Sequence, residues 1–390
     1  MWRPMSLVSI AIFLGILVHK STFALFEDSI TLSCPALRPC TIALASRNPV
    51  TLKCEGGPKN VHVYWQYLDV SQPHARALTL IQSGGSVSQD EDLDSQEYLK
   101  VLDLMSRVEL LSGNLKLLSP RVQDTGIYTC WDGGKHLAYY KIDFQDSENI
   151  YVSHASLDHK VRPNATVDFG LERSVEVFTV WQDWQACDRC GVMGERKKLG
   201  FCYGMVARNS AGMEEPQPCG LIQSRFSQIQ LNSTPELRIE TCIGACTEVA
   251  STNDLIILMV NYRTYLHADA LLECPISLIY KPLYWERGNR TFTHLQQLMN
   301  NASYILDKKT GGGSLFIPIL NKSDEGTYKC YVDHRMVGEF HVMFPKIEDT
   351  SKPQQFTMGE YTMIGISIFF VALFVLSVFQ SSQATDYTDG

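Results

Sequence analysis

The pattern of apolar and polar residues divides the chain into two apolar ends and a long alternating middle. An apolar run over residues 7–18 follows Arg3 and precedes the small residues Thr22 and Ala24, which predicts a secretory signal over residues 1–24. Residues 361–379 are 19 residues without a charge, roughly enough to cross a bilayer as a helix. Between the ends, stretches such as VHVYWQYL alternate in a way that predicts half-buried strands.

The two ends together predict a type I single-pass protein of the plasma membrane with its N-terminus outside the cell. The predicted cytoplasmic tail, residues 380–390, contains no Lys or Arg, so the orientation depends on the signal peptide. A glycolipid-anchor signal is the alternative for this end. Such signals normally stop within the apolar run, whereas here polar residues follow it.

Cysteines and sequons agree with an exported chain. All 12 cysteines lie between Cys34 and Cys330, and their even number predicts disulfide bonds. Five N-glycosylation sequons lie in the same stretch, at Asn164, Asn232, Asn289, Asn301 and Asn321, whereas Asn48 is excluded by Pro49. The net charge of −8 argues against a nucleic-acid partner, because no basic surplus exists to neutralise phosphates.

A phrase of fixed spacing marks the first exported module. Trp65 follows Cys54 by eleven residues, and D-x-G-x-Y-x-C ends at Cys130. This spacing resembles an immunoglobulin domain, in which the two cysteines bridge the sheets, the Trp packs on the bridge and Tyr128 forms the tyrosine corner. The 76 residues between the cysteines leave room for the two extra strands of a variable-type sheet, so we assign residues 25–150 to a V-type domain.

Two further features of this module carry expectations. Asp124 is expected to pair with an Arg near the start of an earlier strand, and Arg107 is the candidate. The acidic stretch of residues 89–97 is interpreted as a solvated loop, with an acidic docking site as the alternative. Cys34 and Cys40 precede the domain and are expected to form a local bridge. An exchange with cysteines of the middle region is the alternative, because connectivity is not readable from sequence.

The same phrase returns near the end of the exported region. Cys274 is followed eleven residues later by Trp285, and Asp324 opens the phrase that ends at Cys330. Residues 254–347 are therefore assigned to a second immunoglobulin-like domain. Its cysteines are 56 residues apart, so it is expected to be the shorter of the two.

The middle region, residues 160–253, contains six cysteines and suggests a small module held by disulfides more than by a core. Its W-x-x-W-x-x-C-x-x-C-G opening at Trp181 and Trp184, followed by a basic stretch, resembles a thrombospondin type 1 repeat. That resemblance implies a cation–π column in which these tryptophans stack with Arg196 and Lys198. It also implies three disulfides, Cys187 with Cys242, Cys190 with Cys246, and Cys202 with Cys219.

Other chemistry for the middle region is less well supported. Cys187 and Cys190 have the spacing of a zinc half-site or a redox pair, but the exported compartment and the cysteine count favour disulfides. The basic stretch could bind anionic glycans, yet three basic residues are few. We therefore expect no metal and no cofactor.

No catalytic motif is found along the chain, and we expect no enzyme activity. The glycine run of residues 311–313 precedes a strand-like stretch and is interpreted as a hairpin turn. Autonomous signalling is not expected either, because the span has no charge and Tyr387 lacks the surroundings of an inhibitory motif.

The predicted fold is all-β, with two immunoglobulin-like sandwiches flanking a thrombospondin-repeat-like module, plus one transmembrane helix. This order of modules resembles the family with sequence similarity 187, which implies a germ-cell setting. We expect a recognition or adhesion protein that binds an unknown cell-surface protein, with the middle module as a rigid spacer. Tyr139 and Tyr140 are the candidate contacts, and their packing on the sheet is the alternative. The other functional reading is a structural subunit of a membrane complex, assembled through span and ectodomain.

Overall fold

The computed structural model describes residues 29–35, 38–54, 62–72, 74–84, 95–170, 173–208, 212–245, 257–318, 320–345 and 366–376. The predicted signal peptide, the predicted tail and Cys246 lie outside these residues. The chain up to Phe344 forms one compact unit, and Pro345 begins a second one.

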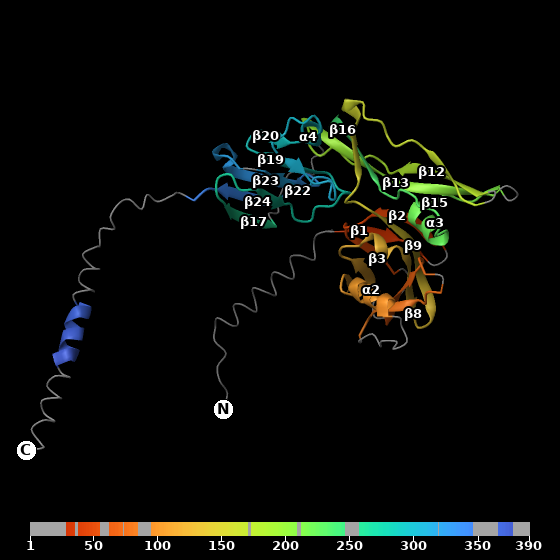
Figure 1. Ribbon diagram of the computed structural model, residues 1–390, viewed down its shortest axis with the longest axis horizontal. Coiled ribbons are helices and arrows are strands. Elements are labelled where there is room, and N and C mark those ends of the chain that lie inside the picture. The colour runs from red at the N-terminus through yellow and green to blue at the C-terminus, as the bar shows by residue number, and fades with distance from the viewer. Residues whose placement is uncertain are drawn as a thin grey trace, which may run out of the picture. The chain divides into compact units, whose positions relative to one another are not determined.

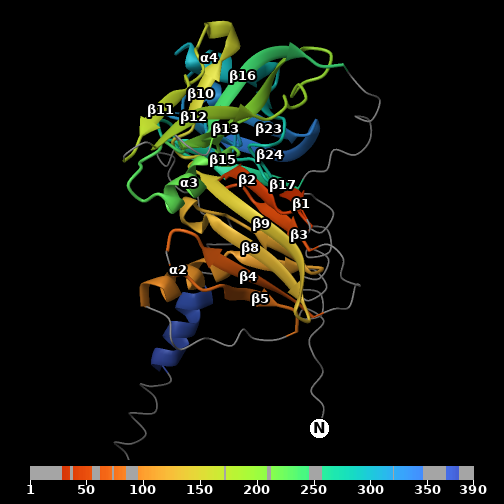
Figure 2. The same cartoon turned by 90° about the vertical axis from the view of Figure 1, so that its right-hand side faces the viewer.

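The first sandwich, residues 29–145, packs two sheets on one apolar core (Figure 1). One sheet has the order β1-β3-β7-β6, with β1 (Ile30–Ser33), β3 (Val50–Lys53), β7 (Asn114–Leu117) and β6 (Val108–Leu111). The other has the order β2-β9-β8-β4-β5, with β2 (Cys40–Ala45), β9 (Lys135–Gln145), β8 (Gly126–Asp132), β4 (Val63–Asp69) and β5 (Leu78–Gln82). Figure 2 shows β9, β8, β4 and β5 side by side.

The N-terminal edge of this sandwich differs from the sequence expectation. β1 pairs in parallel with β3, and β2 pairs in parallel with β9. A disulfide between Cys34 and Cys40 closes the loop between β1 and β2, and the carbonyl oxygen of Cys34 accepts the backbone N–H of Tyr139 at 3.2 Å. The cysteine-bounded loop is therefore part of the sandwich rather than a segment that precedes it.

A helix follows β5 where a loop was expected. Helix α2 (Ser95–Met105) includes the last three residues of the acidic stretch 89–97, whose first six lie outside the described residues. Val101 and Leu104 are spaced three apart, so they fall on one helix face and both are buried in the core of the sandwich. The burial of this face stabilises the helix, although its first residues belong to a strongly acidic segment. The sequence predicted the two extra strands of a variable-type sheet between Cys54 and Cys130. Among the described residues, β5 is one of them.

The middle module, residues 151–245, is built on one long sheet. Its path is β10 (Tyr151–His154), β16 (Glu236–Ile243), β13 (Met193–Arg208), β12 (Arg173–Trp181) and β11 (Ala165–Asp168), with β14 (Gly212–Met213) and β15 (Gln217–Pro218) also paired to β13. Helix α3 (Cys219–Arg225) covers a buried cluster that includes Val175, Val206 and Ile222. The sheet begins nine residues before the expected boundary at 160, and the module has a core as well as disulfides.

The second sandwich, residues 257–344, repeats the two-sheet plan. One sheet has the order β17-β24-β23-β19-β20, with β17 (Leu258–Arg263), β24 (Arg335–Met343), β23 (Gly326–Val332), β19 (Leu283–Arg287) and β20 (Arg290–Phe292). The other contains β18 (Ala270–Glu273), β22 (Ser314–Ile317) and β21 (Ile305–Leu306), and α4 (His294–Leu298) precedes β21. Gly311 and Gly312 have φ of 68° and 105° in the turn between β21 and β22, a conformation that favours glycine.

The three modules of the first unit share one apolar junction. Ala43 and Ala45 of β2, Phe201 of β13, Ile239 of β16 and Ile279 of the second sandwich belong to the same buried cluster. The two sandwiches also touch directly. The side chain of Asn48, 2% exposed, donates to the carbonyl of Lys309 at 3.0 Å and accepts the N–H of Ile279 at 2.9 Å. The middle module is therefore not a simple spacer, because the sandwiches that flank it in sequence meet each other in space.

Residues 366–376 of the second unit are helical, and their apolar side chains are exposed. The remaining residues of the expected span, 361–365 and 377–379, lie outside the described part of the chain. Among the residues that are described, no helix is both long enough and apolar enough to span a bilayer.

Candidate functional site

The cores of both sandwiches are built from the residues that the spacing singled out. In the first, the Cys54–Cys130 disulfide lies beside the fully buried Trp65, and the hydroxyl of Tyr128 donates to the carbonyl of Asp124 at 2.6 Å. The second repeats this arrangement with the disulfide Cys274–Cys330, Trp285, Tyr328 and Asp324. These buried residues fix the two sheets, and strand alternation then decides which neighbours face outward.

A row of aromatic side chains crosses the outward face of the sheet β5-β4-β8-β9-β2. Tyr64 on β4 pairs with Trp131 on β8, which pairs with His136 on β9. The rings of Tyr64 and Trp131 stack with centroids 6.4 Å apart, and those of Trp131 and His136 lie 4.8 Å apart. Tyr139 meets His136 edge-on at 5.5 Å. We call Tyr64, Trp131, His136 and Tyr139 the aromatic row.

The aromatic row combines apolar area with unused hydrogen-bonding capacity. All four side chains are partly exposed. The Nε2 atom of His136 is buried and has no hydrogen-bond partner within the described part of the chain. Lys141 lies 5.9 Å from the centre of the Tyr139 ring and places a positive charge at one end of the row. Aromatic rings with polar edges are the composition that protein interfaces favour.

The two tyrosines predicted as partner contacts have different positions. Tyr139 belongs to the aromatic row, whereas Tyr140 points into the core and is fully buried. The hydroxyl of Tyr140 donates to the carbonyl of Lys53 at 2.6 Å. Successive residues of a strand face opposite sides, so both tyrosines could not lie on one surface. Tyr140 therefore packs within the sandwich, which was the alternative to a partner contact.

The second sandwich carries an equivalent aromatic pair. Tyr284 precedes the buried Trp of β19, Tyr331 follows the second bridging cysteine, and their rings stack at 4.5 Å. Here the middle module reaches the pair, because the guanidinium of Arg189 lies 5.9 Å from the Tyr284 ring centre, although both rings remain partly exposed. Arg189 also donates to the hydroxyl of Thr291 on β20 at 3.2 Å. No local pattern of residues indicated this contact, which depends on how the modules dock.

The ion pair expected in the first sandwich is present. Arg107 donates to both carboxylate oxygens of Asp124, at 2.6 and 3.0 Å, and to Asp103 at 2.9 Å. Burial alone would lower the pKa of Arg107, but the hydrogen bonds and charges of these two carboxylates raise it above its usual value. Two parallel bonds of this kind hold the start of β6 to the turn before β8.

Stacked cations and tryptophans line one surface of the middle module. The ammonium of Lys198 lies 4.8 Å from the ring centres of both Trp181 and Trp184, and the guanidinium of Arg196 lies 5.1 Å from Trp184. The module contains the disulfides Cys187–Cys242 and Cys202–Cys219. Cys190 is also disulfide-bonded, and its expected partner Cys246 lies outside the described residues.

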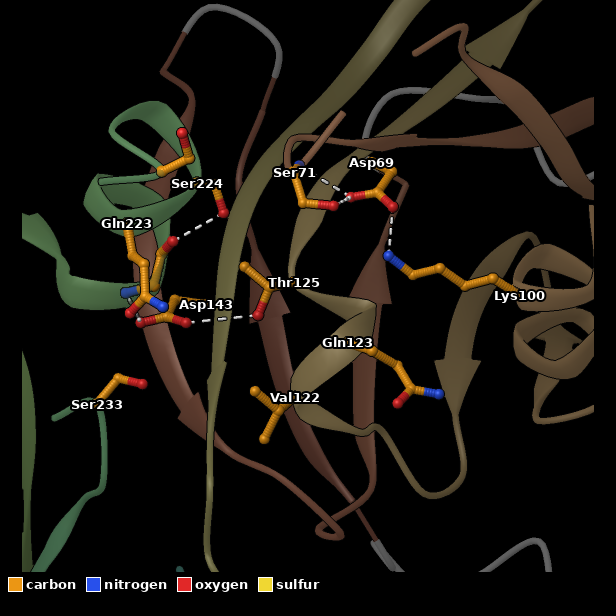
Figure 3. Close-up of a pocket in the computed structure, with 12 residues that line it drawn as sticks. Asp69, Ser71, Lys100, Val122, Gln123, Thr125, Asp143, Gln223, Ser224 and Ser233 are labelled. Carbon is orange, nitrogen blue, oxygen red and sulfur yellow. Dashed lines mark hydrogen bonds and ion pairs between the residues drawn. The ribbon is translucent and has the colours of Figure 1, made fainter. Parts of the chain in front are cut away.

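A polar pocket of about 400 Å³ lies between the first sandwich and α3 (Figure 3). Asp143 of β9 is 2% exposed and accepts hydrogen bonds from the N–H of Gly220 and the amide of Gln145, each at 3.0 Å. Burial raises the pKa of Asp143, although these neutral donors oppose the shift. On the other wall Asp69 pairs with Lys100, and hydrogen bonds hold its pKa below the usual range despite burial.

This pocket lies at a joint between the first sandwich and the middle module. The described residues that line it offer hydroxyl, amide and carboxylate groups and the ammonium of Lys100. Gln145 continues the joint, since its side chain accepts the N–H of Cys202 at 2.9 Å and donates to the carbonyl of the same residue at 2.8 Å. The pocket therefore marks where the first sandwich is tied to the middle module.

All five predicted glycosylation acceptors have exposed side chains. They are Asn164 and Asn232 on the middle module, and Asn289, Asn301 and Asn321 on the second sandwich. Exposure permits attachment, so these sites stay predictions that the fold does not obstruct.

Comparisons with known proteins find similarity to immunoglobulin-like proteins. It is similar to a mouse protein named Ig-like V-type domain-containing protein FAM187A, with 23% identity over 357 residues that cover 83% of each chain. A Bos taurus protein of the same name is 24% identical over 322 residues, covering 75% of this chain and 73% of its own. No family model matches the chain.

Solved structures give immunoglobulin domains as neighbours. The first Ig domain of the mouse polymeric immunoglobulin receptor is 15% identical, with a TM-score of 0.20, covering 28% of this chain and 91% of that one. The extracellular domains of the voltage-gated sodium channel β4 subunit are 18% identical, with a TM-score of 0.18, covering 28% of this chain and 92% of that one.

Proposed function

We propose that this protein is a type I plasma-membrane protein that recognises another protein through the aromatic row of its first sandwich, in cell adhesion or surface recognition. The observation that carries the proposal is the contrast between two equivalent aromatic pairs. Arg189 of the middle module lies beside Tyr284 in the second sandwich, whereas the rings of the row in the first sandwich stack on one another and lie beside Lys141 of the same sandwich. The similar proteins named for a V-type Ig-like domain support the choice of the first sandwich.

The distribution of sequons supports the same face. No sequon lies between residues 25 and 150, and the five acceptors are on the other two modules. Glycans on those acceptors would surround the middle module and the second sandwich with hydrated sugar and leave the first sandwich bare. A bare, partly apolar face next to glycosylated modules is a suitable place for a protein partner.

We infer that the middle module is related to thrombospondin repeats in the way it is stabilised. Its stacked Trp181, Lys198 and Trp184 match the column that such repeats use. In this chain the column belongs to a larger sheet with α3 and its own core, and the module serves to join the two sandwiches.

Proximity labelling of the full-length protein on its native cell surface tests the function. We expect labelled partners on neighbouring cells, and the same partners when an unrelated membrane span replaces the native one. Partners confined to the same cell that disappear with the native span would instead identify a subunit of a membrane complex.

A matched pair of variants tests the face. Trp131→Ala removes the centre of the aromatic row and is expected to weaken partner labelling roughly 30-fold, the effect of losing one interface hot spot. Tyr265→Ala is the control, because Tyr265 is 76% exposed on the second sandwich. Equal labelling by the two variants, at equal surface expression, would rule the row out as the contact.

A further inference from the structure

The middle module meets the two sandwiches in different ways. At the second sandwich, Glu195 of β13 is 5% exposed and accepts the backbone N–H groups of His294 at 2.9 Å and Leu295 at 2.8 Å. At the first sandwich, the contact leaves the polar pocket of about 400 Å³ between its two walls (Figure 3). The N–H of Gly220 on one wall donates to Asp143 on the other at 3.0 Å, so this hydrogen bond spans the joint.

One of the five predicted glycosylation acceptors, Asn232, lies at the rim of this pocket. Its neighbour in the chain, Ser233, lines the pocket on the wall that also carries Gln223 and Ser224 (Figure 3). Ser233 also lines a second hollow of about 520 Å³, together with Asn232 itself and with Asp146, which directly follows β9. Neither hollow is lined by any of the other four acceptors, all of which lie within the described residues. Asn232 is therefore distinguished from them by its position.

The loop that carries Asn232 is fixed on both sides. The N–H of Leu231 donates to Oε1 of Gln223 in α3 at 3.3 Å, and Leu231 is buried. On the other side, Arg162 donates to the carbonyl and the hydroxyl oxygens of Thr234, at 3.1 and 3.0 Å. The hydroxyl of Thr234 in turn donates to Oδ1 of Asn232 at 3.0 Å. A sugar attached to the amide nitrogen of Asn232 therefore starts from a fixed point beside the pocket.

The lining of the pocket suits a neutral ligand with many hydroxyl groups. Its charged groups already have partners, because Asp69 pairs with Lys100 and Asp143 accepts N–H groups. The neutral lining groups are hydroxyls and amides, such as those of Ser227 and Gln123. Such groups both donate and accept hydrogen bonds, as do the hydroxyls and the acetamide of N-acetylglucosamine, the sugar that begins an N-glycan.

We propose that the N-glycan carried by Asn232 occupies this pocket, where its first N-acetylglucosamine units contact the middle module and the first sandwich together and fasten the joint between them. Attachment at the rim holds the sugar at an effective concentration on the order of millimolar, so contacts too weak to retain a free sugar are sufficient. The ligand is thus a modification of the chain itself. The inference rests on the export of the ectodomain that the proposed function assumes.

The pocket and the aromatic row lie at opposite ends of the same strands. Asp69 is the last residue of β4, whereas Tyr64 is its second. Asp143 lies near the end of β9, whereas His136 lies near its start. A glycan in the pocket therefore fastens the joint and leaves the aromatic row uncovered.

Enzymatic release of glycans from the full-length protein tests where the first sugar lies. A peptide-N-glycosidase cuts the bond between Asn and this sugar, and mass spectrometry follows each acceptor separately. Relative to each site's rate in the denatured protein, we expect release from Asn232 in the native protein to be about tenfold slower than release from the other occupied acceptors, because the pocket shields the bond.

The result separates this inference from the proposed function. Release from Asn232 as fast as from the other acceptors would overturn the inference alone, as would an unmodified Asn232 when other sequons carry glycans. The absence of a glycan from all five acceptors would overturn the inference and the proposed export together.

A matched pair of variants tests whether the sugar fastens the joint. Asn232→Asp keeps the oxygen that accepts the hydroxyl of Thr234 but cannot carry a glycan. Hydrogen–deuterium exchange of the Gly220 amide should become about fivefold faster, as expected when contacts worth about one net hydrogen bond are lost across the joint. Asn301→Asp makes the same change at an exposed acceptor of the second sandwich and should leave this amide unaffected. Unchanged exchange in Asn232→Asp, or equal acceleration in both variants, would refute the proposal.

Discussion

The two sandwiches place an aromatic pair at the same position of the same sheet but differ in which side chains lie beside it. In the first, Tyr64 and Trp131 continue across β9 into His136 and Tyr139. In the second, the partner of Tyr331 on β24 is Met336, which is 5% exposed, and Arg189 of the middle module lies over Tyr284. This face of the sheet is therefore suited to contact with other side chains. In the second sandwich the middle module of the same chain provides such a contact through Arg189.

Their ion pairs differ in a related way. In the first sandwich Arg107, just before β6, holds Asp124 in two short bonds, and Asp124 is 1% exposed. In the second, Arg287 on β19 reaches Asp324 at 3.4 Å, and Asp324 is 15% exposed. The first sandwich therefore has the tighter polar clamp beneath its exposed face.

The largest effect is expected from removing the acid of each clamp. Asp124→Ala leaves Arg107 without its main partner in a buried site and should cost the first sandwich about 3–5 kcal/mol of unfolding free energy. Asp324→Ala breaks one long ion pair with Arg287 and one exposed hydrogen bond from the N–H of Asn321, and should cost about 1 kcal/mol. Denaturant unfolding of the full chain, followed by exchange in each sandwich, measures both. Similar losses in the two variants would remove this difference between the sandwiches.

One acid ties each sandwich to the middle module, Asp143 for the first and Glu195 for the second. Substituting these two acids by their amides should change stability in opposite directions. Glu195→Gln removes a carboxylate that three N–H groups need and should loosen the second sandwich by about 2 kcal/mol. Asp143→Asn should leave the free energy of unfolding at pH 8 nearly unchanged or increase it. Burial raises the folded pKa of Asp143, so the ionised form loses stability as pH rises from about 4 towards that raised value. Thermal unfolding at pH 6 and pH 8 distinguishes them, and a stability loss in Asp143→Asn as large as in Glu195→Gln would contradict the assignment.

The smallest effect is expected from the two cations over aromatic rings. Arg189→Ala should loosen the contact between the middle module and the second sandwich by about 1 kcal/mol, because it removes a stacked cation and a hydrogen bond to Thr291. Lys141→Ala removes a cation that contacts only the first sandwich. It should change the free energy of unfolding by about a few tenths of a kcal/mol or less. Hydrogen exchange at β20 and β9 measures the two effects, and a larger loss of protection with Lys141→Ala than with Arg189→Ala would contradict this order.

Local spacing was enough to predict the features that depend on one strand and its neighbours. The residues around Cys54, Trp65 and Cys130 indicated the sheets, and Arg107 was found where the variable-type pattern placed it. The aromatic row was also within reach of sequence reasoning. Tyr64 precedes a buried Trp and Trp131 follows a bridging Cys, so alternation places both on the outer face.

Features that depend on docking between modules could not be predicted in this way. Asn48 was set aside because Pro49 rules out a sequon, yet its buried side chain ties the two sandwiches together. Arg189 belongs to a cysteine motif and gave no sign of reaching Tyr284. The acidic pattern of residues 89–97 indicated a loop, and burial of Val101 and Leu104 further along was what favoured α2. In each case tertiary contacts determine the outcome, and no local period records them.

A photo-crosslinking residue placed at two matched positions shows which of the two sandwiches contacts another protein. With a benzophenone side chain in place of Tyr139 on cells that express the full-length protein, we expect crosslinks to a second protein. With the same group in place of Tyr331, we expect links only within the chain, because Arg189 of the middle module lies beside the neighbouring ring of Tyr284. Crosslinks to other proteins from position 331 and none from position 139 would contradict the proposal that the first sandwich is the recognition face.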